Sequence, residues 1–279
     1  MPLTRIAAFA VDDATGGNPA GVHLSDTLPP AADMQRIAAE VGFSETAFAA
    51  RDGDAWTTRY FAPEAEVPFC GHATIALGAQ LGASYGAGRY RLNLSDGQID
   101  VTARQDGAHW AAELTSPPTT SAPLDRDVQH AILDLFGWTD ADLDPRIAPS
   151  LTQAGATHAL LALRDRATLA AMSYDFDAGQ RLMRDHGLVT INTIQIEAET
   201  LIHSRNAFAF GGVVEDPATG AAAAALGGAL VDLGWPALRG GGRFRVHQGD
   251  DMGAPSRLTV AVTGTAGDGV RVSGITRTI

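Results

Sequence analysis

The stretch Gly71-His72-Ala73-Thr74-Ile75-Ala76-Leu77-Gly78-Ala79-Gln80-Leu81-Gly82 has a near copy, Gly220-Ala221-Ala222-Ala223-Ala224-Ala225-Leu226-Gly227-Gly228-Ala229-Leu230-Val231, which begins 149 positions later (220 − 71). The six identical pairs are Gly71/Gly220, Ala73/Ala222, Ala76/Ala225, Leu77/Leu226, Gly78/Gly227 and Leu81/Leu230. Chance repetition is the alternative in a chain so rich in alanine, but the shared spacing of Gly and Leu favours duplication. The sequence therefore predicts two similar halves, each with one Ala-rich helix.

The two predicted helices also share an N-terminus that begins without bulky side chains. Each follows an acidic loop that contains proline, and each begins at a glycine. The first N–H groups of a helix lack intrahelical acceptors and its dipole is positive there, so such an end attracts anions. Two such ends, one in each half, predict a binding site for the carboxylate of a small acid.

Both helices are apolar nearly all round, which is typical of a helix that a sheet wraps. The sequence predicts an α+β fold of two pseudo-symmetric halves, each a mostly antiparallel sheet curled around a central Ala-rich helix. The stretch Thr115–Pro123 (TSPPTTSAP) predicts a linker. We expect an N-terminal half at residues 1–117 and a C-terminal half at 118–279, with the option that the last strand returns to the first half.

Composition narrows the function classes. The 279 residues are 45% hydrophobic and 19% charged, as in a soluble globular protein, and the net charge of −12 disfavours nucleic acid and anionic lipid as partners. No stretch is long and apolar enough to span a membrane, and residues 1–11 show no secretory leader. The single cysteine, Cys70, excludes an internal disulfide and a multi-cysteine metal site. Together these features predict a cytoplasmic protein.

Polar residues gather in four clusters along the chain. They are Gly42–Phe48 (GFSETAF), Arg59–Thr74 (RYFAPEAEVPFCGHAT), Val214–Ala221 (VEDPATGA) and Gln248–Ser256 (QGDDMGAPS). None matches a phosphate-binding loop, a dinucleotide fingerprint or a cofactor lysine motif, so we expect no cofactor. His72 has no second His or Cys at ligand spacing, so we expect no metal site.

The four clusters, with the earlier stretch Gly17-Asn18-Pro19-Ala20-Gly21-Val22, resemble the PhzF-like family of phenazine-biosynthesis isomerases. The matching motifs run from about residue 11 to 256, so the resemblance covers nearly the whole chain. It implies a fold like that of diaminopimelate epimerase, with the active site between the two halves, and a homodimer. It also implies that Asn18 belongs to the substrate site.

Glu45 is the best candidate for the catalytic base. A desolvated carboxylate can act as a general base near neutral pH, although most glutamates are surface acids or helix caps. The resemblance assigns to Glu45 the proton transfer that the family's Ser-Glu-Thr motif performs. It assigns substrate binding and proton handling to His72, for which a structural hydrogen-bonding role is the alternative.

The second helix start supplies the other candidates. Asp216 precedes it, where an acid complements the helix dipole, and the resemblance makes it a polar partner in the site. We expect the backbone N–H groups of Gly71, His72, Gly220 and Ala221 to bind the substrate carboxylate.

Two positions depart from the better-known family pattern, which has Ser where this chain has Ala221 and often Arg where it has Ala254. The hydroxyl is lost at Ala221 but the N–H remains. These departures favour a small acid other than the phenazine precursor. A two-thiol epimerase is excluded, because Thr219 stands where the second cysteine would fall. We expect Cys70 to be a buried small residue.

The sequence thus predicts a cofactor-independent isomerase that moves a proton between carbons of a small carboxylic acid, with Glu45, His72 and Asp216 as catalytic residues. Two alternatives stay open at this point. One is a lyase or dehydratase that uses the same base. The other is a protein of the same fold that binds a small acid or a partner without catalysis.

Overall fold

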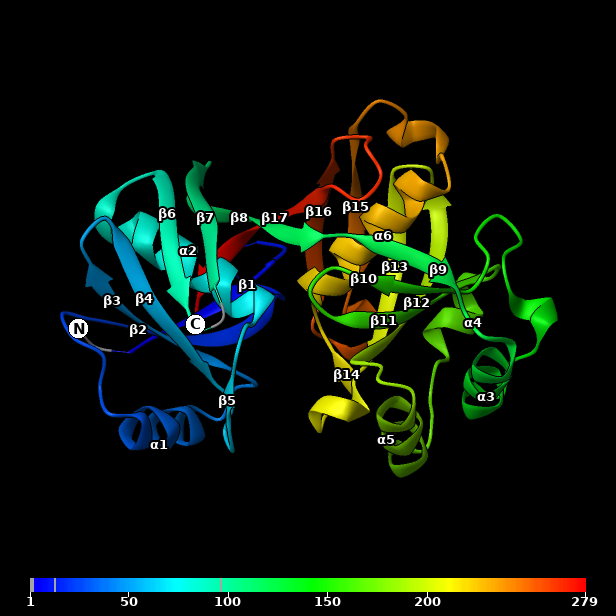
Figure 1. The fold of residues 1–279 in the computed structure, drawn as a ribbon, viewed down its shortest axis with the longest axis horizontal. Helices are drawn as coiled ribbons and strands as arrows, with labels where there is room; N and C mark the ends of the chain where they lie inside the picture. Colours follow the sequence, from blue (N-terminus) through cyan, green and yellow to red (C-terminus); the bar gives the residue numbers. More distant parts are fainter. Residues whose placement is uncertain (1–2, 13, 96) are drawn as a thin grey trace. The chain divides into compact units, whose positions relative to one another are not determined.

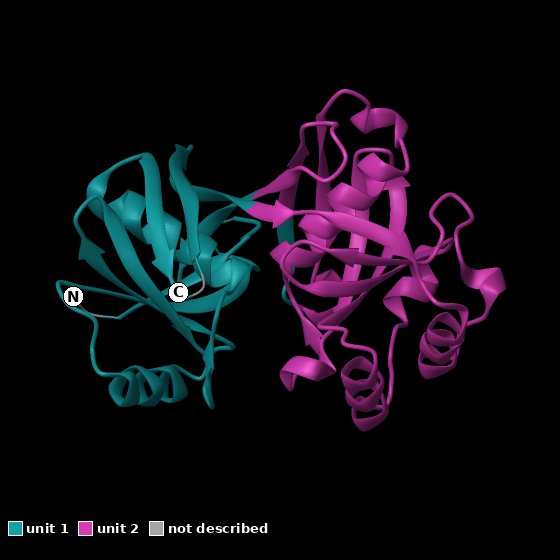
Figure 2. Ribbon diagram, in the orientation of Figure 1, with its two compact units in different colours: residues 1–115, 254–257, 273–279 teal, residues 116–253, 258–272 magenta. Residues whose placement is uncertain are grey.

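The computed structural model describes residues 3–12, 14–95 and 97–279. It forms two compact units, shown in Figure 2. Unit 1 comprises residues 1–115, 254–257 and 273–279, and unit 2 comprises residues 116–253 and 258–272. The C-terminal segment and a short piece near residue 255 therefore belong to unit 1. Across the described residues, no helix is both long and apolar enough to cross a membrane.

Unit 1 is a curled sheet with two helices (Figure 1). Its elements are β1 (Thr4–Ala8), β2 (Asn18–Ser25), α1 (Ala31–Val41), β3 (Thr46–Asp52), β4 (Ala55–Phe61), β5 (Glu66–Val67), α2 (Gly71–Tyr85), β6 (Gly88–Leu94), β7 (Gly97–Asp106) and β8 (His109–Pro118). The pairs β1–β2, β3–β4, β4–β5, β6–β7 and β7–β8 are antiparallel, whereas β2–β3 and β4–β6 are parallel.

The core of unit 1 surrounds α2. This helix packs against β1, β2, β3, β6 and β7, and every residue from His72 to Ala79 is buried. Gly78 allows the close approach: a Cβ there would lie 2.4 Å from Cγ2 of Val101 in β7. The helix is apolar all round because the sheet surrounds it.

Unit 2 repeats this plan with more helices. Its elements are β9 (Thr120–Pro123), α3 (Arg126–Phe136), η1 (Asp140–Asp142), β10 (Ser150–Gln153), β11 (Thr157–Leu163), α4 (Arg166–Ala170), α5 (Phe176–Asp185), β12 (Thr190–Ala198), β13 (Leu201–Ala207), η2 (Ala209–Gly211), β14 (Glu215–Asp216), α6 (Gly220–Asp232), η3 (Pro236–Leu238), β15 (Gly242–Gln248), η4 (Asp250–Met252), β16 (Ser256–Val262) and β17 (Gly269–Thr278). The strands β8, β16 and β17 each carry residues of both units.

The two faces of the sheet in unit 2 have different neighbours. On one face, residues of β11, β12 and β13 form a core with α3, α4 and α5. The other face holds α6, which contacts β9, β10 and β11 and is buried at every position from Ala222 to Leu230. Gly227 allows a close approach of the sheet to α6, as Gly78 does for α2 in unit 1. A Cβ at Gly227 would lie 3.0 Å from Val260 and from Val270. The predicted α+β class, with a sheet around each Ala-rich helix, is confirmed.

The strand pairings relate the two units residue by residue. The row Gly21, Thr46, Phe61, Glu66 runs across β2 to β5, and the row Ala159, Ile191, Ala207, Glu215 runs across β11 to β14 with the same parallel and antiparallel order. Glu66 and Glu215 are separated by the same 149 positions as the two helix starts (215 − 66). By this correspondence Thr190 occupies the place of Glu45, Asn206 that of Tyr60 and His158 that of Ala20.

The predicted linker at Thr115–Pro123 contains the boundary between the units, which falls between Thr115 and Ser116, but most of its residues form strands and not a loop. Residues up to Pro118 continue β8, and Thr120–Pro123 form β9, which pairs antiparallel with β10. Its prolines lie at strand ends, where a missing N–H costs little, so they do not prevent pairing. The chain therefore passes from unit 1 to unit 2 within an extended strand.

Candidate active site

Glu45 immediately precedes β3, and its carbonyl oxygen accepts a hydrogen bond from the N–H of Gly21 in β2 (3.1 Å). This hydrogen bond continues the parallel pairing of β2 with β3, so the side chain of Glu45 lies at the end of the strand. The side chain is only 14% exposed, and its Oε2 atom is buried without a hydrogen-bond partner in the part of the chain that the structure describes. A buried carboxylate oxygen without a donor is costly, and such atoms are concentrated where a substrate or a proton is handled.

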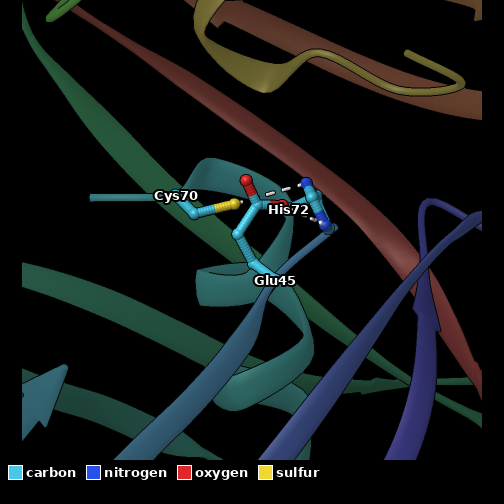
Figure 3. A group of neighbouring side chains, drawn as sticks. All are labelled: Glu45, Cys70 and His72. Carbon is cyan, nitrogen blue, oxygen red and sulfur yellow. Dashed lines mark hydrogen bonds and ion pairs between the residues drawn. The ribbon is translucent and has the colours of Figure 1, made fainter. Parts of the chain in front are cut away.

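His72 lies against this carboxylate from the first turn of α2. Its Nε2 atom is 3.4 Å from Oε2 of Glu45 and 3.4 Å from Oγ of Ser44, and its side chain is 7% exposed. Its Nδ1 atom is 3.4 Å from Sγ of Cys70. Figure 3 shows the three side chains of Glu45, Cys70 and His72 converging at the helix start. The structure therefore brings together two of the three predicted catalytic residues.

The start of α2 has the open N–H groups that the sequence predicts. Cys70 is the N-cap in an extended conformation, no side chain caps the helix, and no acid lies in the first turn. The first intrahelical bond runs from the N–H of Thr74 to the carbonyl of Cys70 (3.0 Å). The N–H groups of Gly71, His72 and Ala73 precede it and so have no acceptor within the helix. This geometry can bind an anion beside Glu45.

Two supporting residues escaped the sequence analysis. The hydroxyl of Thr74 donates to the carbonyl of Cys70 (2.7 Å) and lies 2.6 Å from the hydroxyl of Tyr60. Tyr60 is fully buried, and that burial raises the pKa of its hydroxyl. Tyr60 and Thr74 thus tie the helix start to β4. The signal was present in the motif, since both residues belong to the cluster Arg59–Thr74, but spacing alone does not show the contact.

Asp216 lies in β14, in unit 2, and is 8% exposed. The hydroxyl of Thr219 donates to its Oδ2 (2.5 Å), and the amide of Gln248 donates to its carbonyl (2.7 Å). Gln248 also accepts from the N–H of Thr219 (3.2 Å). Like α2, α6 then begins at Gly220 with no side-chain cap and no acid in its first turn. Gln248 is a positioning residue here that sequence reasoning left without a role.

The remaining candidates divide between the units. Asn18 begins β2, opposite Ala8, and is 2% exposed. It belongs to unit 1 with Glu45, Gly71 and His72, whereas Asp216, Gly220 and Ala221 belong to unit 2. The joint action of the two groups on one substrate stays a prediction.

His72 does have ligand-type neighbours, contrary to the expectation from sequence spacing. Glu45, Cys70 and His72 each offer a ligand atom, and these atoms lie within 4.8 Å of one another. Cys70 is two residues from His72, so a second ligand-type residue does lie at contact distance, and Cys70 is half-buried rather than a core residue. Sequence spacing missed the group because its third member, Glu45, comes from another strand.

Comparison with known proteins places the chain in a family. The family model described as "Phenazine biosynthesis-like protein" matches residues 6–278. An uncharacterized isomerase of Deinococcus radiodurans is 31% identical, covering 98% of this chain and 92% of that protein. The trans-2,3-dihydro-3-hydroxyanthranilate isomerase of Pseudomonas chlororaphis is 32% identical, covering 92% of this chain and 88% of that protein.

Solved structures agree in fold. A phenazine biosynthesis protein of the PhzF family from Bacillus anthracis matches with a TM-score of 0.87 at 21% identity, covering 100% of this chain and 98% of that one. A protein from Pseudomonas aeruginosa titled a predicted epimerase matches with a TM-score of 0.84 at 25% identity, covering 99% and 96%. A probable proline racemase matches at 0.65 and 15% identity, covering 99% and 90%, which shows shared architecture alone. With the family match over nearly its whole length, the chain belongs to the PhzC-PhzF family, and it is an isomerase of that family.

Proposed function

We propose that this isomerase moves a proton between two carbons of a small unsaturated carboxylic acid without a cofactor, with Glu45 as the general base. The observation that carries the proposal is the buried Oε2 of Glu45, which accepts no hydrogen bond from any described residue and lies 3.4 Å from Nε2 of His72. In the reaction, Glu45 takes a proton from a carbon next to an unsaturated group. The double bond shifts, and a proton returns at another carbon, so no oxidant or reductant is needed.

His72 and the start of α2 support this step from within unit 1. The open N–H groups of Gly71 and His72 would bind the substrate carboxylate and stabilise the negative charge that develops as the proton leaves. The imidazole of His72, 3.4 Å from Glu45, would orient that carboxylate or pass the proton on. Asn18 is proposed as a further substrate contact.

We propose Asp216, Gly220 and Ala221 as the second group of residues that acts on this substrate. The support is the likeness of α6 to α2, with the same uncapped start and the same absence of a first-turn acid. Thr219 and Gln248 hold Asp216 in place.

The two departures from the family pattern bear on the substrate. Ala221 supplies an N–H but no hydroxyl, and Ala254 supplies no positive charge where Arg is frequent. One relative is named for trans-2,3-dihydro-3-hydroxyanthranilate. Because of the departures at Ala221 and Ala254, we propose that this chain acts on a different small acid. We propose a homodimer in the cytoplasm as its working form.

The experiment that tests the reaction is solvent deuterium incorporation. The protein is incubated in heavy water with a panel of small unsaturated and amino acids, and each acid is analysed by mass spectrometry. We expect at least one acid to gain deuterium, and Glu45→Gln to lower that rate by about 10²- to 10⁴-fold while the circular dichroism spectrum is unchanged.

The matched control is Glu64→Gln, because Glu64 is an exposed carboxylate in the loop before α2. It should incorporate deuterium at the wild-type rate. Full incorporation by Glu45→Gln would overturn the role of Glu45. An elimination product in place of an isomer would show a lyase.

A further inference from the structure

A second cluster of ligand-type residues lies wholly within unit 2. His203 in β13 and His247 in β15 are directly in register on parallel strands, so both side chains project from the same face of the sheet. This is the face that α4 covers, away from α6. Asp250 follows in η4, and one ligand atom of each of the three residues lies within 4.8 Å of the other two.

The orientation of His203 is the strongest sign of a ligand. Its Nε2 atom lies 2.5 Å from Oε2 of Glu197, and the N–H at this position donates to that carboxylate. In a neutral imidazole with that N–H, the other ring nitrogen, Nδ1, carries a lone pair. This Nδ1 atom is buried with no hydrogen-bond partner among the described residues. Metal-binding histidines are typically held in this way, with one nitrogen donating to a carboxylate and the other turned to the metal.

Glu197 owes its position to an irregularity in β12. The pairing register of β12 with β13 shifts between Ile196 and Ala198, so Glu197 is the extra residue of a bulge. Bulges re-aim side chains and are frequent beside functional sites.

The two rings have the separation that a shared ion requires. Their centres are 5.5 Å apart and their planes are nearly perpendicular. Two imidazoles on one tetrahedral zinc ion, each with a Zn–N bond of about 2 Å, have ring centres about 5 Å apart. From this geometry we propose that His203, His247 and Asp250 bind a first-row divalent cation, with Zn²⁺ the best match and Glu197 as the carboxylate that orients His203.

The surrounding charge is compatible with a cation. Arg166 is the nearby positive group, and it pairs with Asp251 at 2.9 Å. That ion pair holds η4 against α4. The carboxylates of Asp250 and Glu197 add negative charge beside the three proposed ligands. Two imidazoles and one carboxylate leave open coordination positions, as in zinc sites that keep a water molecule. The cation would fix η4 to the sheet just before the chain returns to unit 1 at residue 254.

This proposal departs from the expectation of no metal site, and it is independent of the reaction proposed for Glu45. The test is calorimetric titration of the metal-free full chain with Zn²⁺. We expect one zinc ion per chain, and His247→Ala and Asp250→Ala should each weaken binding by at least about tenfold. Glu197→Gln should weaken it by about 10- to 100-fold, because it removes only the orienting carboxylate.

Two controls separate this site from other histidines and from Cys70. His130→Ala removes an exposed histidine of α3 that lies 3.8 Å from Asp140, and it should leave zinc affinity unchanged. Cys70→Ser should also leave it unchanged, which separates this site from the cluster at Glu45. The proposal is overturned if the wild-type chain binds no zinc, if His247→Ala and Asp250→Ala bind it as tightly as the wild type, or if Cys70→Ser alone abolishes binding.

Discussion

Units 1 and 2 share a fold but differ in the residues that carry chemistry. In the place where unit 1 has Glu45, the strand correspondence puts Thr190 in unit 2. Glu45 has a buried oxygen without a hydrogen bond to any described residue. The hydroxyl of Thr190 donates to Asn206 (2.7 Å) and lies 2.8 Å from Nδ1 of His158. A residue whose hydrogen bonds are used internally cannot take a proton from a substrate. The comparison therefore favours one base per chain, supplied by unit 1.

The starts of α2 and α6 also differ in their side chains. In unit 1 the N-cap is Cys70, whose sulfur faces His72, and in unit 2 it is Thr219, whose hydroxyl is held by Asp216. His72 corresponds to Ala221, so the imidazole is present in one unit only. Both ends keep the open N–H groups. The repeat thus keeps the uncapped helix start in both units, while the side chains proposed to act on the substrate differ between them.

The largest difference that we expect in stability comes from two equivalent ion pairs. Arg205 and Glu215 are buried, with side chains 10% and 4% exposed, whereas Arg59 and Glu66 are 32% and 38% exposed. Glu215→Ala leaves a buried guanidinium without its carboxylate and should cost about 3–5 kcal/mol. Glu66→Ala at the equivalent place should cost about 1 kcal/mol or less. Urea unfolding of both variants measures the difference.

Arg205 sharpens this test because it also donates to the backbone carbonyls of Leu169, Ala170 and Met172. Arg205→Lys keeps the charge but cannot reproduce the planar set of donors, so it should be destabilising as well. Equal losses in Glu215→Ala and Glu66→Ala would show that burial of the pair in unit 2 does not matter to folding.

A pH effect of intermediate size should come from His158. Complete burial lowers its pKa from the ordinary 6.5 to about 4. The unfolded chain therefore binds more protons than the folded chain between these values, and stability falls as pH falls through this window. The expected loss from this residue between pH 7 and pH 4 is about 3 kcal/mol. Unfolding midpoints measured across the window check it.

The variant His158→Gln should lose less stability over the same window, because it has no group to protonate. Unit 1 has Ala20 at the corresponding place, so the effect belongs to unit 2. A pH profile of His158→Gln parallel to that of the wild type would contradict the assignment.

How much the sequence could predict depends on whether a feature is local. The repeat at Gly71 and Gly220 is local, and it correctly predicts both helices and the curled sheets. Glu45 and His72 come from different motifs, and only the resemblance pointed to both, because their contact arises from the packing of α2 against the sheet. The stretch Thr115–Pro123 does contain the boundary between the units, but its strands were missed because prolines at strand ends resemble prolines in loops.

The cluster at His203 and His247 shows the limit of spacing more clearly. The two histidines are 44 positions apart (247 − 203), far from any metal motif, and only the parallel pairing of β13 with β15 puts them side by side. Glu197 reaches His203 through a bulge, which no sequence pattern announces. Contacts made by strand register are therefore the part of the site that sequence reasoning misses.

The smallest expected effect compares the glycines that let each sheet approach its helix. Alanine in a helix is favoured over glycine by about 1 kcal/mol, so the substitution is destabilising only where the Cβ has no room. At Gly78 the Cβ would lie 2.4 Å from Val101 and 3.1 Å from Ala112, whereas at Gly227 the nearest atoms are 3.0 Å away. Gly78→Ala should cost about 1–3 kcal/mol, and Gly227→Ala should change the free energy of unfolding by less. If Gly227→Ala is the more destabilising variant in urea unfolding, the tighter packing of unit 1 around its helix is wrong.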